Sequence, residues 1–434
     1  MQTEENVSRG LPATDSDLYA GTLDCVQCGL CLTACPTYRL TGRETSSPRG
    51  RVHLLRGVAE GHISLSDVVA DEMHLCLGCR ACETACPSGV QYGALLEQGR
   101  AAVAEAGLRN RLAQRVEGVA LRQVLARRRR LKFLVAFLAG VQRLGLDRLF
   151  APLLPQALAR GSRMLPRIAG RKERERLPTF TPGKAPRRGR VAFLEGCVMP
   201  ELFGRVNRAS VRVLAANGFD VWVPDEQVCC GALHAHAGDL DSARELARQN
   251  KSAFEPGDHE PFDAWISNSA GCGAALREMD HWLPEGSGGL AEKARDVTEF
   301  LDEVGWREEL SSFSARVCYD DPCHLIHAQG IAKAPRRLLE MIPELQIVQH
   351  ANADHCCGAA GTYNLMQPAM AQAVLEKKMD DLEAADPEWI ASGNPGCLMQ
   401  LQAGVSSRGL KAKVVHPVEL LDRSLSGSDW EMDA

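Results

Sequence analysis

The chain has 434 residues, 45% of them hydrophobic, and a formal net charge of −5. This length predicts two to four domains, and the apolar fraction excludes a disordered protein. The 17 cysteines are an odd number, which argues against a complete set of disulfides and favours metal-bound thiolates in a reducing, cytosolic compartment. The N-terminus is polar and no stretch is long and apolar enough for a bilayer, so we expect neither a secretory signal nor a membrane span.

Composition divides the chain into four regions. Residues 1–105 hold eight cysteines and are predicted to form a helix-rich two-cluster ferredoxin-like domain. Residues 106–188 hold no cysteine and are predicted to be a basic helical linker segment. Residues 189–310 and 311–434 are two copies of one cysteine-rich unit with alternating strand and helix signals. The expected fold class is therefore multidomain α/β plus α.

Two cysteine runs in the first region share the spacing C-x2-C-x2-C-x3-C-P. In proteins with two such runs, the fourth cysteine of each run ligates the cluster of the other run. We therefore predict two [4Fe–4S] clusters, with zinc excluded because it would need separate pairs without the third cysteine and the proline. The predicted ligands of one cluster are Cys25, Cys28, Cys31 and Cys86, and those of the other are Cys76, Cys79, Cys82 and Cys35. Between the runs, residues 51–57 and 66–73 have helical periodicity.

The segment from residue 109 to 190 is strongly basic, with 22 Lys and Arg against four acids. Its net charge of +18 leaves −23 on the rest of the chain. Residues 127–130 are four arginines, and apolar residues at near-helical spacing follow them. Such a stretch binds an anionic membrane surface or docks against acidic faces of this chain or a partner subunit. Nucleic acid is not expected, because few aromatic residues are present to stack on bases.

A CCG tripeptide occurs twice in the second half, at residues 229–231 and 356–358. One cysteine lies 32 or 33 positions before each tripeptide, and another lies 42 or 40 positions after its second cysteine. The two predicted sets are Cys197, Cys229, Cys230 and Cys272, and Cys323, Cys356, Cys357 and Cys397. Adjacent cysteines fit a cluster better than one tetrahedral ion, and the glycine permits a sharp turn. We expect a further iron–sulfur cluster in these repeats, with zinc or buried free thiols as alternatives.

The secondary structure predicted around each tripeptide is also repeated. The matched strands are 191–194 and 316–319, then 264–267 and 389–392, and the matched helices are 239–250 and 368–382. Parallel α/β sheets build their sites on the loops that follow strands, so these loops should carry the cysteines. Cys318 falls inside a strand and is predicted to be a buried, inert thiol.

Four histidines lie near the repeated cysteines. His234 and His236 have no histidine counterpart in the second repeat, so the repeat does not support them as ligands. His324 and His327 flank Cys323, where they could serve a proton-coupled or quinone role or hydrogen-bond to nearby backbone.

The motifs CVQCGLCLTACPTY (25–38), DDPCHLIHAQGI (320–331), CCGAAGTYNL (356–365) and GNPGC (393–397) resemble those of a known family. The family comprises the iron–sulfur subunits of glycolate oxidase and their relatives in lactate utilisation, anaerobic glycerol-3-phosphate dehydrogenase and heterodisulfide reductase. The resemblance implies an oxidoreductase subunit that carries electrons from a separate FAD-containing subunit towards quinone. No substrate site and no flavin are expected on this chain, since its only glycine cluster, residues 286–289, lacks the dinucleotide-binding spacing.

Three alternatives remain open within this resemblance. The heterodisulfide reductase relatives end each unit in C-x2-C, but this chain has Ser269 and Asn394 in place of the first cysteine, which puts disulfide chemistry in doubt. The complex could oxidise lactate or glycerol 3-phosphate in place of glycolate. The chain could also be a zinc-stabilised scaffold that docks flavin subunits to the inner face of the cytoplasmic membrane.

Overall fold

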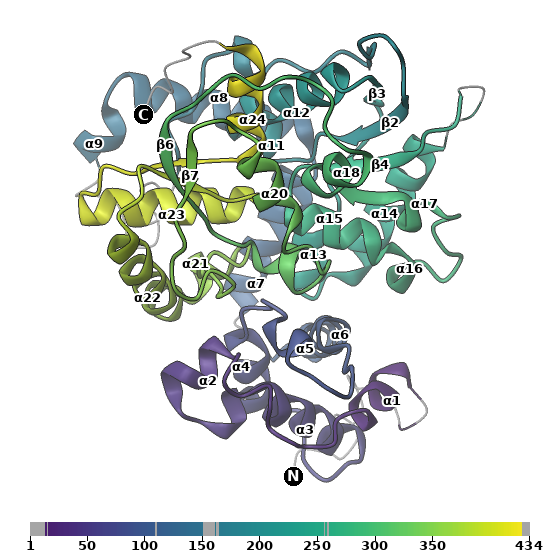
Figure 1. The fold of residues 1–434 in the computed structure, drawn as a ribbon. Helices are drawn as coiled ribbons and strands as arrows, with labels where there is room; N and C mark the ends of the chain where they lie inside the picture. The colour runs from purple at the N-terminus through teal and green to yellow at the C-terminus, as the bar shows by residue number, and fades with distance from the viewer. Residues whose placement is uncertain are drawn as a thin grey trace.

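The computed structural model describes residues 14, 16–108, 111–150, 161, 165–255, 257 and 260–427. The polar N-terminal stretch 1–13 and residues 151–160 of the basic segment lie outside these residues. Figure 1 shows an N-terminal helical lobe below two α/β units. The predicted fold class is confirmed, and no described helix is long and apolar enough to cross a bilayer.

The N-terminal lobe is helical, with no strand among residues 16–108. Its helices are α1 (Asp17–Leu23), α2 (Pro36–Thr41), η2 (Glu44–Ser46), α3 (Pro48–Ala59), α4 (Asp67–Leu75), α5 (Ala81–Thr84) and α6 (Tyr92–Glu105). Pro36 and Pro48 each begin a helix, a position where the missing N–H costs no hydrogen bond. The helices predicted over 51–57 and 66–73 are confirmed as parts of α3 and α4, which pack around Leu55 and Met73.

Helices also make up much of the described part of the basic segment. They are α7 (Arg111–Val119), η3 (Ala120–Leu125), α8 (Arg128–Arg143), α9 (Leu146–Phe150) and η5 (Lys172–Arg174). Helix α8 buries only Val135 and Ala139, against Ile168 and Leu202. Strand β1 (Phe180–Thr181) lies within the range predicted as linker, yet it pairs with the first sheet.

The first α/β unit is built on a five-stranded sheet in the order β1-β3-β2-β4-β5. Its further strands are β2 (Gly189–Leu194), β3 (Phe219–Trp222), β4 (Ala264–Ser267) and β5 (Ala294–Asp296). All pairs are parallel except β1 with β3. The helices are α11 (Met199–Leu202), α12 (Gly204–Ala216), α13 (Ala232–His236), α14 (Leu240–Phe254), α15 (Ala270–Arg277), α16 (Met279–Trp282), α17 (Leu290–Lys293) and α18 (Val297–Val304).

The second unit repeats this plan on a parallel sheet in the order β7-β6-β8-β9. Its strands are β6 (Ala315–Tyr319), β7 (Leu345–Ile347), β8 (Trp389–Ala391) and β9 (Lys413–Val415). Its helices are α19 (Cys323–Ile326), α20 (Ala334–Glu340), α21 (Tyr363–Met366), α22 (Pro368–Ala385), α23 (Pro395–Arg408) and α24 (Pro417–Ser426). The four predicted strands are confirmed as β2, β4, β6 and β8, and they pair as β2 with β4 and β6 with β8.

One hydrophobic core runs through both units, from Val191 and Phe193 in the first to Val317 and Ile390 in the second. Polar contacts cross the same boundary. Arg212 on α12 is paired with Asp422 on α24 at 2.5 Å. The two repeats therefore form one packed body.

His416 is a buried link across this boundary. Its Nε2 lies 2.9 Å from the carbonyl oxygen of Asn268, and its Nδ1 accepts from the backbone N–H of Val418. Burial lowers the pKa of His416 to about 3, so the folded protein keeps the imidazole neutral.

We expect His416 to make stability depend on pH. An unfolded histidine titrates near about 6.5, so between that pH and the folded pKa only the unfolded state binds the proton. The stability contributed by neutral His416 is full above the unfolded pKa and falls as the pH drops towards the folded one. When the pH falls from about 7 to about 5, the unfolding free energy of the parent should therefore decrease by about 2 kcal/mol more than that of His416→Gln, which lacks the titrating group. Urea unfolding at both pH values measures this, and equal losses would contradict it.

Candidate functional site

The eight cysteines of the lobe fall into two groups by burial. Cys35, Cys76, Cys79 and Cys82 are buried and are called the inner set. Cys28 is exposed and Cys25, Cys31 and Cys86 are partly exposed, and these four are called the outer set.

The inner set draws on both sequence motifs. Burial raises the pKa of Cys82 well above its usual range, and the neighbouring thiols of Cys79, Cys76 and Cys35 raise it further. Cys35, from the first run, is thus near enough to Cys82 for their charges to interact, as are the other leading cysteines of the second run. This is the neighbourhood required by the crossed ligand division predicted from the two runs.

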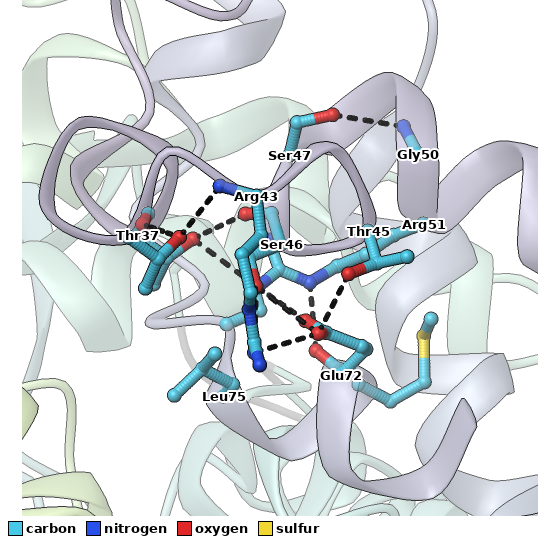
Figure 2. Close-up of polar contacts among 12 residues, drawn as sticks. Thr37, Arg43, Thr45, Ser46, Ser47, Gly50, Arg51, Glu72 and Leu75 are labelled. Atoms are coloured by element: carbon cyan, nitrogen blue, oxygen red, sulfur yellow. Dashed lines mark hydrogen bonds and ion pairs between the residues drawn. The ribbon is translucent and has the colours of Figure 1, made fainter. Parts of the chain in front are cut away.

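A buried acid, Glu72 on α4, holds the segment that follows Cys35 (Figure 2). One carboxylate oxygen of Glu72 accepts hydrogen bonds from Arg43 at 2.9 Å, Thr45 at 3.0 Å and Ser46 at 3.1 Å. The three donors come from the stretch between α2 and α3. Glu72 therefore ties the first cysteine run to the helix that leads into the second.

Arg51 on α3 completes this network from the other side (Figure 2). Its Nε donates to the backbone oxygen of Glu72 at 2.7 Å, and its Nη2 donates to the Thr37 hydroxyl at 3.1 Å. That hydroxyl lies 3.2 Å from the Sγ of Cys35. The guanidinium thus connects α4 to a thiol of the inner set through the Thr37 hydroxyl.

The surroundings of Arg51 fit a bound anionic cluster. Burial alone would lower the pKa of Arg51, but Tyr92, Cys76, Cys35 and Glu72 raise it overall, so the side chain is a fixed cation. Its Nη1 is buried and has no hydrogen-bond partner within the described part of the chain. Hydrogen bonds and charge next to cluster sulfurs tune such centres, so a spare N–H on a cation that interacts with Cys35 and Cys76 suits an iron–sulfur cluster.

The cysteines of each CCG unit converge after the central strands. Cys197 and Cys272 follow β2 and β4, and Cys323 and Cys397 follow β6 and β8. The backbone needs glycine next to the paired cysteines, because Gly358 has φ +88° and an added Cβ would lie 2.6 Å from a backbone oxygen. We call Cys197, Cys229, Cys230 and Cys272 the first CCG set, and Cys323, Cys356, Cys357 and Cys397 the second CCG set.

Within each CCG set the sulfurs are in contact. The Sγ atoms of Cys230 and Cys272 are 3.3 Å apart, as are those of Cys357 and Cys397. Hydrogen bonds from Cys356 and Cys397 hold the pKa of Cys357 well below its usual range. A lowered thiol pKa favours the thiolate that metals bind.

Both CCG sets line one cavity of about 350 Å³ between the two units and the lobe. Asn394 bridges the units at this cavity, since its Nδ2 lies 3.5 Å from the Sγ of Cys397 and its Oδ1 accepts from the Gly271 N–H at 3.2 Å. The hydroxyl of Ser269 donates to the same oxygen at 3.4 Å. The two positions that lack the extra cysteine thus form a polar contact between the repeats.

Three of the four histidines sit where the lobe meets the two units. His236 is bonded through Nδ1 to Glu97 of α6 at 3.0 Å, and its ring lies 5.2 Å from that of His324. His327 contacts the Thr84 hydroxyl at 2.9 Å. These contacts join the lobe to both units. His234 is buried in α13.

The lobe touches the second CCG set through sulfur-bearing residues. Cys79 and Cys356 belong to one apolar cluster, and Cys323 packs against it. The Tyr363 hydroxyl in the same cluster donates to the backbone oxygen of Leu75 at 2.7 Å. The inner set therefore adjoins the second CCG set.

The sequence analysis missed a buried ion pair behind the second CCG set. Lys378 on α22 lies 2.7 Å from Asp320, and both side chains are 1% exposed. The helical pattern held a signal, because Lys378 falls on the face that buries Val374, Leu375 and Leu382. The thiol predicted to be inert, Cys318, is buried, and burial raises its pKa to about 11.

Replacing Arg51 tests the network around Cys35. Arg51→Met removes one partner of a buried pair, so we expect a loss of about 3 kcal/mol in unfolding free energy and reduced iron content. Arg43→Met is the matched control, because Arg43 pairs with the same Glu72 but its side chain is 60% exposed, against 0% for Arg51. We expect the control to lose at most about 1 kcal/mol and to keep its iron. Equal effects of the two variants would contradict this role of Arg51.

Two family models match the chain. One described as Cysteine-rich domain matches residues 191–277 and 317–402. One described as 4Fe-4S dicluster domain matches residues 21–90. Both fall on the segments that carry the cysteine sets, and they support iron–sulfur clusters as cofactors.

Similar proteins match over nearly the full length. The Escherichia coli protein named glycolate oxidase iron-sulfur subunit is 33% identical over 439 residues, covering 98% of this chain and 99% of that protein. The Bacillus subtilis protein named "Probable glycolate oxidase iron-sulfur subunit" is 38% identical over 416 residues, covering 92% and 93%. Lactate utilization protein A of Geobacillus kaustophilus is 28% identical over 241 residues, which cover 54% of this chain and 98% of that protein. With this identity over the whole length and the cysteine sets in place, the chain belongs to the family of glycolate oxidase iron–sulfur subunits.

Proposed function

We propose that this chain is the electron-transfer subunit of a flavin-dependent glycolate dehydrogenase complex, in which it receives electrons from an FAD-containing subunit and passes them towards quinone. The observation that carries the proposal is the graded burial of the thiol sets. The outer set meets solvent, the inner set is buried behind it, and the second CCG set adjoins the inner set. This arrangement suits a chain of centres that leads from a docked partner into the protein.

We assign one [4Fe–4S] cluster to the outer set and one to the inner set. We assign a further iron–sulfur cluster to at least one of the CCG sets. When bound, such clusters supply one-electron transfer. In each CCG set two of the sulfurs come from adjacent residues, which fit a larger centre better than one tetrahedral ion. This favours an electron carrier over a zinc-stabilised scaffold.

The exposed surface beside the outer set is a suitable docking site for the flavin-containing subunit. Val26 and Leu30 lie on the loop between Cys25 and Cys31 and are 68% and 59% exposed. Apolar side chains exposed together on such a loop are typical of a protein interface. A partner seated there would bring its flavin next to the outer set.

Glycolate as the substrate rests on the names of the full-length relatives, because no residue of this chain is assigned to substrate binding. The relatives named for lactate utilisation match only about half of the chain. A complex that oxidises lactate or glycerol 3-phosphate is therefore the second candidate. Testing which of glycolate, lactate and glycerol 3-phosphate reduces the clusters distinguishes the three substrates.

We expect Cys79→Ser to lower the iron content of the purified complex and to abolish dye reduction by glycolate. Flavin reduction by glycolate should persist, because the substitution leaves the partner intact. Cys318→Ser is the control, since Cys318 is equally a buried cysteine but lies in a strand outside the four sets. Anaerobic purification followed by addition of glycolate, lactate or glycerol 3-phosphate measures both reactions. Normal dye reduction by the Cys79 variant would remove the inner set from the proposed path.

The chain is further proposed to be cytoplasmic and to lie against the inner face of the cytoplasmic membrane through α8. Figure 1 places α8 at the end of the molecule away from the lobe. Phe133, Phe137 and Leu144 on and just after α8 are 77%, 69% and 74% exposed. Exposed basic residues flank them, among them Arg129, Arg130 and Lys132. Apolar side chains within a basic surface are what an anionic lipid interface binds.

The double variant Phe133→Ser, Phe137→Ser should lose most of its binding to vesicles that contain anionic lipid. Val68→Ser is the matched control, because Val68 is 66% exposed on α4 in the lobe. Binding of the parent should also weaken steeply with added salt, since counterions screen surface charges. Vesicle co-sedimentation measures both effects. Vesicle binding that does not depend on the salt concentration, or that is unchanged in the double variant, would contradict the membrane role of α8.

A further inference from the structure

The two CCG sets differ in the charge buried beside them. Behind the second CCG set, the Lys378 Nζ lies 2.7 Å from an oxygen of Asp320 and donates to the backbone oxygens of Asn352 and Ala353 at 2.8 and 3.1 Å. His350 also faces Asp320, at 3.7 Å, but burial lowers its pKa to about 4, so it is neutral near neutral pH. Lys378 is therefore the cation at this place.

Lys378 acts on the sulfurs of the second CCG set. Burial alone would lower the pKa of Lys378, but the charges of Asp320, Cys357 and Cys356 raise it overall. Lys378 and Cys356 also line one pocket, together with Cys79 of the inner set. The ammonium group and the paired cysteines are thus close to each other in a buried region, where charges interact more strongly than in water.

The first CCG set has a different environment. The buried polar side chain on the corresponding helix α14 is Asn250, which is neutral and bonds to the Val228 N–H and the Cys229 oxygen. The acid before the first cysteine, Glu195, pairs with Arg128 at 2.8 Å. The Arg128 side chain is 29% exposed, against 1% for Lys378. Water screens the charge of Arg128, whereas the buried charges of Lys378 and Asp320 are screened much less.

The lobe also contacts the two sets differently. The apolar cluster that contains Cys79 of the inner set includes Cys356 and packs against Cys323, and it contains no cysteine of the first unit. The lobe reaches the first unit through Glu97, which bonds to His236 and to the indole N–H of Trp282 at 3.1 Å. An electron leaving the inner set therefore meets the second CCG set within one packed apolar cluster.

We propose that the second CCG set, rather than the first, accepts electrons from the inner set, and that Lys378 is the positioned charge that stabilises its reduced state. In this step one electron leaves the inner set, which is oxidised, and arrives at the second CCG set, which is reduced, with no atom or proton transferred. The electrons originate in the hydroxy acid that the flavin-containing partner oxidises, and a quinone is the final oxidant. This inference rests on the proposed function, because it requires the second CCG set to hold a centre that can be reduced.

The test is a redox titration of the anaerobically purified holoprotein, with its centres followed by electron paramagnetic resonance. Chemical reductant replaces substrate and partner, so the result does not depend on which hydroxy acid the complex oxidises. The variant Cys357→Ser serves to assign the spectrum: the signal that disappears in this variant belongs to the second CCG set. Lys378→Met should lower the midpoint potential of that signal, because a positive charge near the added electron is lost. Burial raises the pKa of Asp320 to about 7, so the titration is run well above that pH, where Asp320→Asn should raise the midpoint because a negative charge is lost.

Opposite shifts distinguish an electrostatic role from a merely structural one. The double variant Lys378→Met, Asp320→Asn should return the midpoint towards the parent value. Lys377→Met is the matched control, since Lys377 is the exposed neighbour on the same helix and should leave the midpoint unchanged. Shifts of the same sign in the two single variants, or no shift in Lys378→Met with its signal intact, would overturn the proposal.

Two further outcomes are also decisive. If Lys378→Met does not fold, Asp320→Asn alone decides, because a rise supports the proposal and an unchanged or lowered midpoint overturns it. If Cys357→Ser removes no reducible signal, the second CCG set holds no electron-accepting centre and the proposal fails. The proposed function is judged separately, by whether glycolate reduces the outer and inner sets in the complex.

Discussion

The inner set depends on a buried cation, Arg51, because the thiols of this set come from two loops far apart in the chain. Arg51 bonds to the backbone of α4, which leads into the second cysteine run, and to Thr37, which lies against Cys35 of the first run. Glu72 balances the charge and ties down the stretch between α2 and α3. Without a fixed positive charge, four thiolates gathered in an apolar region would repel one another. The same guanidinium therefore serves folding and electrostatics.

The two α/β units show how one fold can hold sites of different character. Both place their cysteines on loops at the carboxyl ends of the central strands, and both need glycine after the paired cysteines. Their surroundings have diverged at single positions, with Asn250 buried in one unit and the Lys378–Asp320 pair in the other. Ser269 and Asn394 join the units by a polar contact at the shared cavity. The repeat supplies the scaffold, and the buried polar residues distinguish the two sites.

Much of the fold followed from patterns within short stretches. The strands at 191–194 and 264–267 and the helix at 368–382 were predictable because their apolar periodicity is local. Strands β1, β3, β5, β7 and β9 were not predicted, since each has only two to four residues and is defined by its pairing with a neighbour. The burial of Lys378 was not predicted for a related reason. A lysine in a helix is usually solvated, and only the position of Asp320 and two backbone oxygens shows why this one is buried.

The sequence by itself determined the kind of chemistry, because thiol ligands, their spacing and the glycine and proline beside them are properties of a few adjacent residues. It also determined that two similar units follow the first domain. Only the tertiary structure decided how the thiol sets are ordered from the surface inwards, which set adjoins which, and which charges lie beside them. These features join residues hundreds of positions apart, such as Cys79 with Cys356 and Glu97 with His236. They arise from the packing of three domains around one cavity, which no local pattern encodes.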